Sequence, residues 1–247
     1  MLEGALLKSI VSGVTVFPAS MVSTDKEKTV CITGHRRSKI IPYKNNSELT
    51  YSAIRLMLYR YIDMAIEAGY ESFISGLASG TDLWSAEYVI MKKHRNQNIK
   101  LLAVMPFLKH AEFMNNSDRS ALAEVEKNAD YLVTVNENPD IYYGKHISAN
   151  SSPTLYRDRN YYMVDHSSAV IAFVNNNDSQ YSGTAQTLNY AYRNGRKIRS
   201  FSMDTISEII EKSDSDIRVI GHEIALLENV FSNNQSNFSH LYKCKSK

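Results

Sequence analysis

The chain has 247 residues, of which 43% are hydrophobic and 22% charged, a composition ordinary for a globular protein with a sizeable core. Its net charge of +2 argues against nucleic acid or an anionic membrane as the partner, and no apolar run approaches the ~20 residues that a membrane-spanning helix needs. The two cysteines, Cys31 and Cys244, are too few and too far apart for a disulfide framework or a metal cluster, so we expect a cytoplasmic protein without metal or cofactor.

Residues 1–27 precede the first clear strand pattern, and we expect them to form a leader to the domain or to pack as an extra strand. The mildly apolar segment 10–19 is interrupted by Ser12, Gly13 and Pro18, which argues against a signal peptide.

From residue 28 onward, strand patterns alternate with helix patterns. Apolar and β-branched runs predict strands at residues 28–33, 72–75, 100–106, 130–136, 169–174 and 197–201. Helical spacing predicts helices at residues 49–68, 81–93, 121–129, 155–166, 183–194, 206–212 and 217–231. This order predicts an α/β fold with a parallel sheet and helices on both faces, because parallel neighbours need crossover connections. We expect the strand at residue 28 to be central.

Ligands in such open sheets bind beyond the carboxyl ends of the strands. Gly183 and Thr184 open a helix there, and the free N–H groups and partial positive charge of a helix start suit a phosphate. An ordinary helix start capped by Thr184 is the alternative. Two polar stretches, 175–180 and 137–153, have the length of a ligand-covering loop and of a lid or site wall.

The loop at residues 76–82 carries small residues and one acid. Gly76, Gly80 and Thr81 would bring backbone toward a ligand, with Asp82 near its sugar or amine groups. The alternative is that Thr81 caps the helix and Asp82 complements the helix dipole. Further along, Glu87 could supply a carboxylate for sugar hydroxyls or acid/base chemistry, or could be a solvated helix residue.

Two further pairs are candidate ligand contacts. Gly34 and His35 follow the first strand, and the neighbouring Arg36 suits bidentate contact with phosphate. Arg159 and Asn160 lie in an otherwise aromatic helix, where they could meet a phosphate, or where Arg159 could pair with a nearby aspartate.

Six motifs occur in one order over residues 28–205: Thr-Gly-His-Arg at 33–36, Ser-Gly-Leu-Ala-Ser-Gly-Thr-Asp at 75–82, Met-Pro-Phe at 105–107, Ala-Asp at 129–130, Arg-Asn-Tyr-Tyr-Met-Val-Asp at 159–165 and Ser-Gly-Thr at 182–184. This order resembles the YpsA-like branch of the SLOG superfamily (SMF/DprA–LOG), whose members have a Rossmann-like fold. The resemblance implies a nucleotide-binding domain at residues 28–205, with residues 206–247 as its C-terminal helices and tail. It also implies a pocket for a nucleotide or a nucleotide-derived ligand such as ADP-ribose.

The resemblance does not imply one reaction, because the superfamily includes phosphoribohydrolases, immune sensor domains and DNA-uptake proteins. The hydrolases carry a Pro-Gly-Gly-x-Gly-Thr-x-x-Glu motif with a catalytic Glu, and here Thr187 stands in its place. We therefore favour a binding or sensing module over an N-glycosidic hydrolase, in which Asp82 or Glu87 would be the catalytic carboxylate. The sequence leaves ligand identity open, and it leaves a homo-oligomer open as well.

Overall fold

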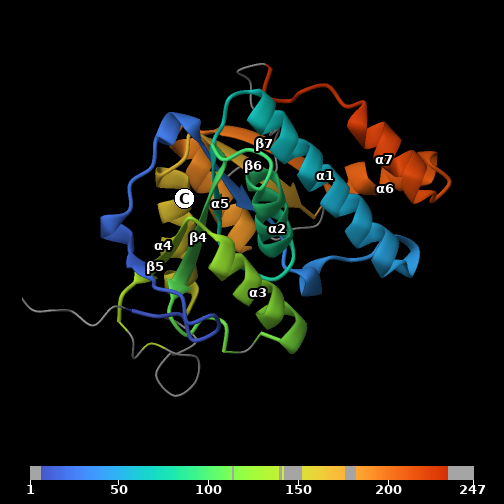
Figure 1. Cartoon of the computed structure of the whole chain (residues 1–247). Helices are drawn as coiled ribbons and strands as arrows, with labels where there is room; N and C mark the ends of the chain where they lie inside the picture. Colours follow the sequence, from blue (N-terminus) through green and yellow to red (C-terminus); the bar gives the residue numbers. More distant parts are fainter. Residues whose placement is uncertain (1–6, 113, 139–140, 142–151, 176–181, 233–247) are drawn as a thin grey trace, which may run out of the picture.

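The computed structural model describes residues 7–112, 114–138, 141, 152–175 and 182–232 (Figure 1). The described strands form one sheet of seven in the order β1-β5-β4-β3-β2-β6-β7, and every pair within it is parallel. The strands are β1 (Phe17–Pro18), β2 (Thr29–Thr33), β3 (Ser72–Ser75), β4 (Lys100–Phe107), β5 (Tyr131–Asn136), β6 (Ala169–Val174) and β7 (Lys197–Ser202). The prediction of an open, parallel, Rossmann-like sheet is confirmed.

Helices cover both faces of the sheet, as predicted (Figure 1). They are α1 (Ser47–Glu67), α2 (Thr81–Lys93), α3 (Asn116–Asn128), α4 (Ser152–Asp165), α5 (Gly183–Arg193), α6 (Met203–Lys212) and α7 (Ile217–Ala225). The side chains of each buried strand alternate between two apolar cores, because successive side chains of a strand point to opposite faces of the sheet. In β2, Val30 and Ile32 pack into the core under α1, α2, α3, α6 and α7, whereas Cys31 faces the core under α4 and α5.

The largest differences from the predicted helix boundaries are at the start of α3 and the end of α7. Helix α3 begins at Asn116 rather than at 121, because the Asn115 side chain accepts a hydrogen bond from the Asp118 N–H and so caps an earlier turn. Helix α7 ends at Ala225 rather than at 231. None of the described helices combines the length and hydropathy that a bilayer span requires.

The N-terminal segment joins the sheet through β1, which pairs with Val133 and Thr134 of β5. The same segment is held by a hydrogen bond from the Ser9 hydroxyl to Glu126 of α3. The extra-strand alternative for residues 1–27 thus describes part of this segment. The domain boundaries after residues 27 and 205 stay predictions.

Strand β2 is interior, with β3 on one side and β6 on the other, but the middle position of the sheet belongs to β3. From β2 the chain proceeds to β3 on one side, and from β6 it proceeds to β7 on the other. The connections therefore diverge between β2 and β6, which opens a crevice at the carboxyl ends of these two strands.

Candidate functional site

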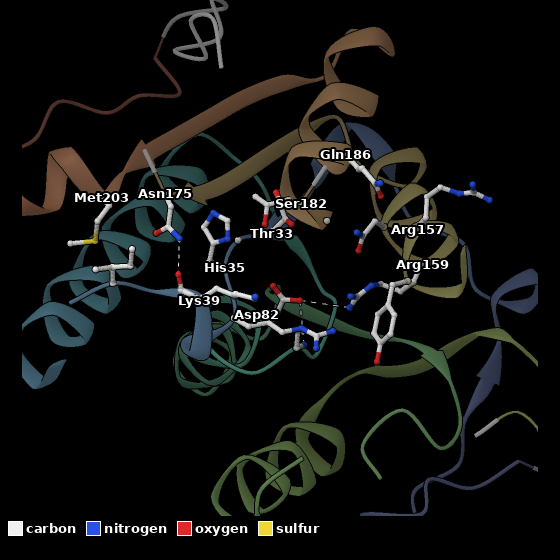
Figure 2. Close-up of a pocket in the computed structure, with 18 of the residues that line it drawn as sticks. Thr33, His35, Lys39, Asp82, Arg157, Arg159, Asn175, Ser182, Gln186 and Met203 are labelled. Atoms are coloured by element: carbon white, nitrogen blue, oxygen red, sulfur yellow. Dashed lines mark hydrogen bonds and ion pairs between the residues drawn. The ribbon is translucent and has the colours of Figure 1, made fainter. Parts of the chain in front are cut away.

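A cavity of about 910 Å³, here called the first cavity, lies at the carboxyl ends of β2 and β6 (Figure 2). Its walls come from the end of β2, the connection from β2 to α1, the start of α2, helix α4 and the starts of α5 and α6. Figure 2 shows Lys39, Asn175 and Met203 at one end of this cavity, and Arg157, Arg159 and Gln186 at the other.

The start of α5 presents free backbone donors to the first cavity. The Ser182 hydroxyl accepts a hydrogen bond from the Ala185 N–H at 3.0 Å, which satisfies one donor of the first turn. Within the described chain, no oxygen accepts a hydrogen bond from the N–H of Gly183 or Thr184. A Cβ built on Gly183 would meet only Asn160 Nδ2, at 3.8 Å, so a ligand can approach this backbone. Together these features make the start of α5 a candidate anion site.

Basic side chains surround this helix start. Among the described residues that line the first cavity, Arg36, Lys39, Arg157 and Arg159 are basic and only Asp82 is acidic. The Arg36 guanidinium lies over the Tyr156 ring, 5.1 Å from its centroid, and no described carboxylate forms an ion pair with it. The excess of positive charge favours an anionic ligand.

Asp82 and Arg159 form a buried pair in the cavity wall (Figure 2). Arg159 Nη1 lies 3.6 Å from Asp82 Oδ2 and also donates to the Gly76 carbonyl. Burial raises the pKa of the Asp82 carboxyl, while Arg159 and a hydrogen bond from the Ala78 N–H, at 3.3 Å, oppose that rise. A carboxyl with a raised pKa at a cavity wall could exchange a proton with a ligand.

The first cavity contains most of the predicted contact residues: Gly34, His35, Arg36, Asp82, Arg159, Asn160, Gly183 and Thr184. Gly76 lies elsewhere, in the wall of an adjoining cavity of about 800 Å³, here called the second cavity. The expectation that Gly76 would share one cavity with the others is therefore wrong. Gly76 packs so tightly beneath Arg159 that a Cβ there would overlap the guanidinium.

Gly80 and Thr81 line neither cavity, contrary to the expectation that they would face a ligand. The loop after β2 packs against the start of α2 instead, where a ligand was expected. Thr81 Oγ1 donates to the His35 carbonyl at 3.1 Å, and Gly80, with φ of +90°, lies against the Arg37 backbone. These residues position the loop that carries Arg36.

Glu87 lies on the exposed side of α2 and lines neither cavity. Burial of part of its side chain raises the pKa of the carboxyl, and Arg55 opposes that rise. The hypothesis that Glu87 serves as a carboxylate inside the site has no support in this geometry.

Thr187, which replaces the expected glutamate, is buried, and its hydroxyl donates to the Gly183 carbonyl at 2.8 Å. It does not line the first cavity. The structure thus places no carboxylate on α5 at this point.

Sequence reasoning missed one wall of the first cavity, which consists of Lys39, Ile41, Pro42 and Tyr43. This wall belongs to the connection at residues 34–46, which is longer than the ~2–6 residues usual between strand and helix, and that length was the available signal. The Asn175 side chain donates to the Lys39 carbonyl at 2.8 Å and ties this wall to the end of β6. Most of the predicted covering loop at residues 175–180 and of the predicted lid at residues 137–153 lies outside the described residues, which include only 175, 137–138, 141 and 152–153 of these stretches.

A sequence model of the YspA SLOG family (YpsA) matches residues 30–206 of the chain. The chain belongs to this family. Similar proteins include the UPF0398 proteins of Staphylococcus aureus strains JH9 and JH1, each 26% identical over 141 residues, which are 57% of this chain and 69% of the relative. Among solved structures, DNA processing protein A (DprA) from Streptococcus pneumoniae is similar, with a TM-score of 0.43 and 18% identity. That match covers 71% of this chain, and the chain spans about half the length of that structure, 50%.

Proposed function

We propose that this SLOG protein binds a nucleotide-derived small molecule, either ADP-ribose-like or a nucleoside phosphate, as a cytoplasmic sensor or sequestering module. The observation that carries the proposal is the pair of unpartnered N–H groups at Gly183 and Thr184, open to a cavity with four basic side chains. Backbone donors at a helix start, combined with arginines, are a common way to hold phosphate.

The remaining walls suit the other parts of a nucleotide. Ile41, Pro42 and Met203 give the first cavity an apolar region, where a base could lose contact with water. The volume of about 910 Å³ falls within the range of ~300–1,000 Å³ that holds drug-sized ligands. A nucleotide would place its phosphate at Gly183 and its base toward Ile41.

The second candidate function is an N-glycosidic hydrolase acting on nucleotides. One observation favours it: Asp82 is a buried carboxyl with a raised pKa in the wall of the first cavity, as a general acid would be. Two observations weigh against it, namely the threonine at position 187 and the engagement of Asp82 with Arg159. Binding without turnover is therefore the better supported function.

Two measurements on the same samples separate these candidates. Titration calorimetry with AMP, ADP, ADP-ribose, NAD and cyclic nucleotides tests binding, and incubation with nucleoside monophosphates followed by assay for free base tests hydrolysis. We expect binding of at least one adenine nucleotide and release of base far below about 1 per second, a modest rate for an enzyme.

Turnover near that rate would overturn the binding-only proposal. Asp82→Asn would then be the first variant to test, with Glu87→Gln as its matched control on the same helix. Loss of activity in the first variant alone would assign the carboxylate to Asp82. Absence of binding to any ligand in the panel would overturn the proposal itself.

A further inference from the structure

The second cavity adjoins the first and shares Arg36, Ala78 and Tyr156 with it. Its volume of about 800 Å³ is close to the 910 Å³ of the first, so each is large enough for a substantial part of a ligand. The second cavity is bounded by the loop after β3, by the residues that follow β4, and by the start of α3. None of these elements contributes to the anion site at Gly183.

The junction between the two cavities is cationic. Arg36 is exposed, is held against the face of Tyr156, and pairs with no described carboxylate. An anionic group that passes from one cavity to the other would pass this guanidinium. Arginine is suited to such a position because its planar donors match the oxygens of a phosphate.

His110 distinguishes the second cavity from the first. It lines this cavity with only 6% of its surface exposed, and neither ring nitrogen has a hydrogen-bond partner among the described residues. Buried polar atoms are usually hydrogen-bonded, so two unpartnered nitrogens on one side chain need an explanation. If the histidine only filled space, an apolar ring could replace it without loss of stability.

The charge state of His110 narrows the chemistry that it can recognise. Burial is the main cause that lowers the pKa of the imidazole, to about 3, and the positive charges of Arg159 and Arg36 act in the same direction. The nearby Phe107 carbonyl opposes them, although its geometry with the ring nitrogens is not that of a hydrogen bond. The ring is thus neutral at physiological pH and offers one donor and one acceptor. That combination suits a sugar hydroxyl or the edge of a base, and a neutral ring offers no charge attraction to a phosphate.

We propose that the second cavity binds an uncharged sugar or nucleoside group, joined through a diphosphate to the nucleoside in the first cavity, and that His110 is its recognition residue. This inference rests on the proposed function, and it names the ligand as one with two uncharged ends and an anionic linker. Arg36 contacts the linker. The aromatic Tyr51 and Tyr156 and the carboxylate of Asp118 supply the remaining surface for the second group.

The two ring nitrogens are shielded from water in the ligand-free structure. Contact with a ligand therefore requires a side-chain adjustment in the wall of the second cavity. Arg36 is exposed and Tyr156 is partly buried, so both can move without opening the apolar cores.

The test compares ADP with ADP-ribose by titration calorimetry, in the wild type and in His110→Phe. ADP-ribose adds an uncharged ribose and carries less negative charge than ADP, so simple charge attraction cannot produce a preference for it. We expect the wild type to bind ADP-ribose about tenfold more tightly than ADP, a difference of about 1.4 kcal/mol. In His110→Phe this preference should vanish while the affinity for ADP is retained.

The melting temperature of the ligand-free variant separates recognition from a structural role. Phenylalanine keeps a planar aromatic ring, somewhat larger than imidazole, and removes two unpartnered polar atoms, so His110→Phe should melt at or above the wild-type temperature. The matched control is His222→Phe, at an exposed position on α7 that lines neither cavity, and it should leave both affinities unchanged.

Equal affinities of the wild type for ADP and ADP-ribose would overturn this inference and leave the proposed function intact. The same holds if His110→Phe keeps the preference, or if it melts several degrees lower than the wild type. Failure of the wild type to bind either molecule would overturn both proposals.

Discussion

Replacement of Gly183 by valine tests the anion site with little disturbance of the fold. The φ angle of Gly183 is not in the left-handed region, and an added Cβ would meet only Asn160 Nδ2, at 3.8 Å, an ordinary contact. Valine also has a slightly better helix propensity than glycine. We therefore expect the ligand-free variant to melt within about 2 °C of the wild type, since 1 kcal/mol shifts the melting temperature of a protein this size by ~2–4 °C.

The expected loss of ligand stabilisation follows from the two N–H groups that valine would cover. Hydrogen bonds to a charged group contribute about 1.5–3 kcal/mol each, so loss of both weakens binding roughly 100-fold or more. A ligand at 100 times its dissociation constant stabilises the wild type by roughly 2.7 kcal/mol, or about 5–10 °C. At the same concentration the variant would gain only about 0.4 kcal/mol, or about 1–2 °C.

The assay is thermal melting of both proteins with ADP-ribose, NAD, AMP, ATP and cyclic nucleotides. Gly183→Ala serves as the graded control, because a single methyl group should reduce the shift less than valine does. Equal shifts in wild type and Gly183→Val would show that the ligand binds away from the start of α5. No shift with any ligand in the wild type would remove the adenine-nucleotide proposal.

Three further predictions concern stability. Gly76→Ala should lower the melting temperature by several degrees, because the added Cβ would displace Arg159 from a buried ion pair whose disruption costs about 3–5 kcal/mol. The control is Gly221→Ala, where a Cβ has room inside α7, and it should not lower the melting temperature. Equal melting temperatures of the two variants would contradict the reasoning. Burial raises the pKa of the Glu126 carboxyl, so the wild type loses stability as pH rises through that pKa. Glu126→Gln should therefore have a higher melting temperature than the wild type at pH 7. The difference between the two melting temperatures should close on acidification toward pH 4.5, the ordinary pKa of a glutamate. The pKa of His110 is lowered to about 3 in the folded protein, so as pH falls below 6.5 the imidazole becomes protonated in the unfolded chain before it does in the folded one. The amount by which His110→Phe melts above the wild type should therefore grow from pH 7 to pH 5. A difference that stays constant over this range would refute the assignment.

Local patterns in the sequence were sufficient to predict the framework of this protein. The strand Ala169–Val174 and the helix Thr81–Lys93 have the predicted boundaries. Both patterns that predict them, an apolar run for a buried strand and helical spacing of apolar residues, depend only on residues that are neighbours in the sequence. The order of these elements also predicted a parallel sheet, whose divergent connections locate the crevice. Gly183 and Thr184 were identifiable for the same reason, since a glycine after a strand marks a helix start.

Only the tertiary structure decided which polar and small residues face the crevice. Gly80 and Gly183 look alike in sequence, but the Arg37 backbone covers the first, whereas the second remains open. Glu87 and Asp82 lie on one helix, yet the direction of their side chains leaves the first exposed and buries the second beside Arg159. The second cavity gave no local signal, because His110 gains its meaning from segments near residues 36, 78 and 156 that meet only when the sheet forms. The partners of a side chain depend on packing between segments that are distant in the sequence. Such packing produces no periodic pattern in the sequence around the residues that it brings together.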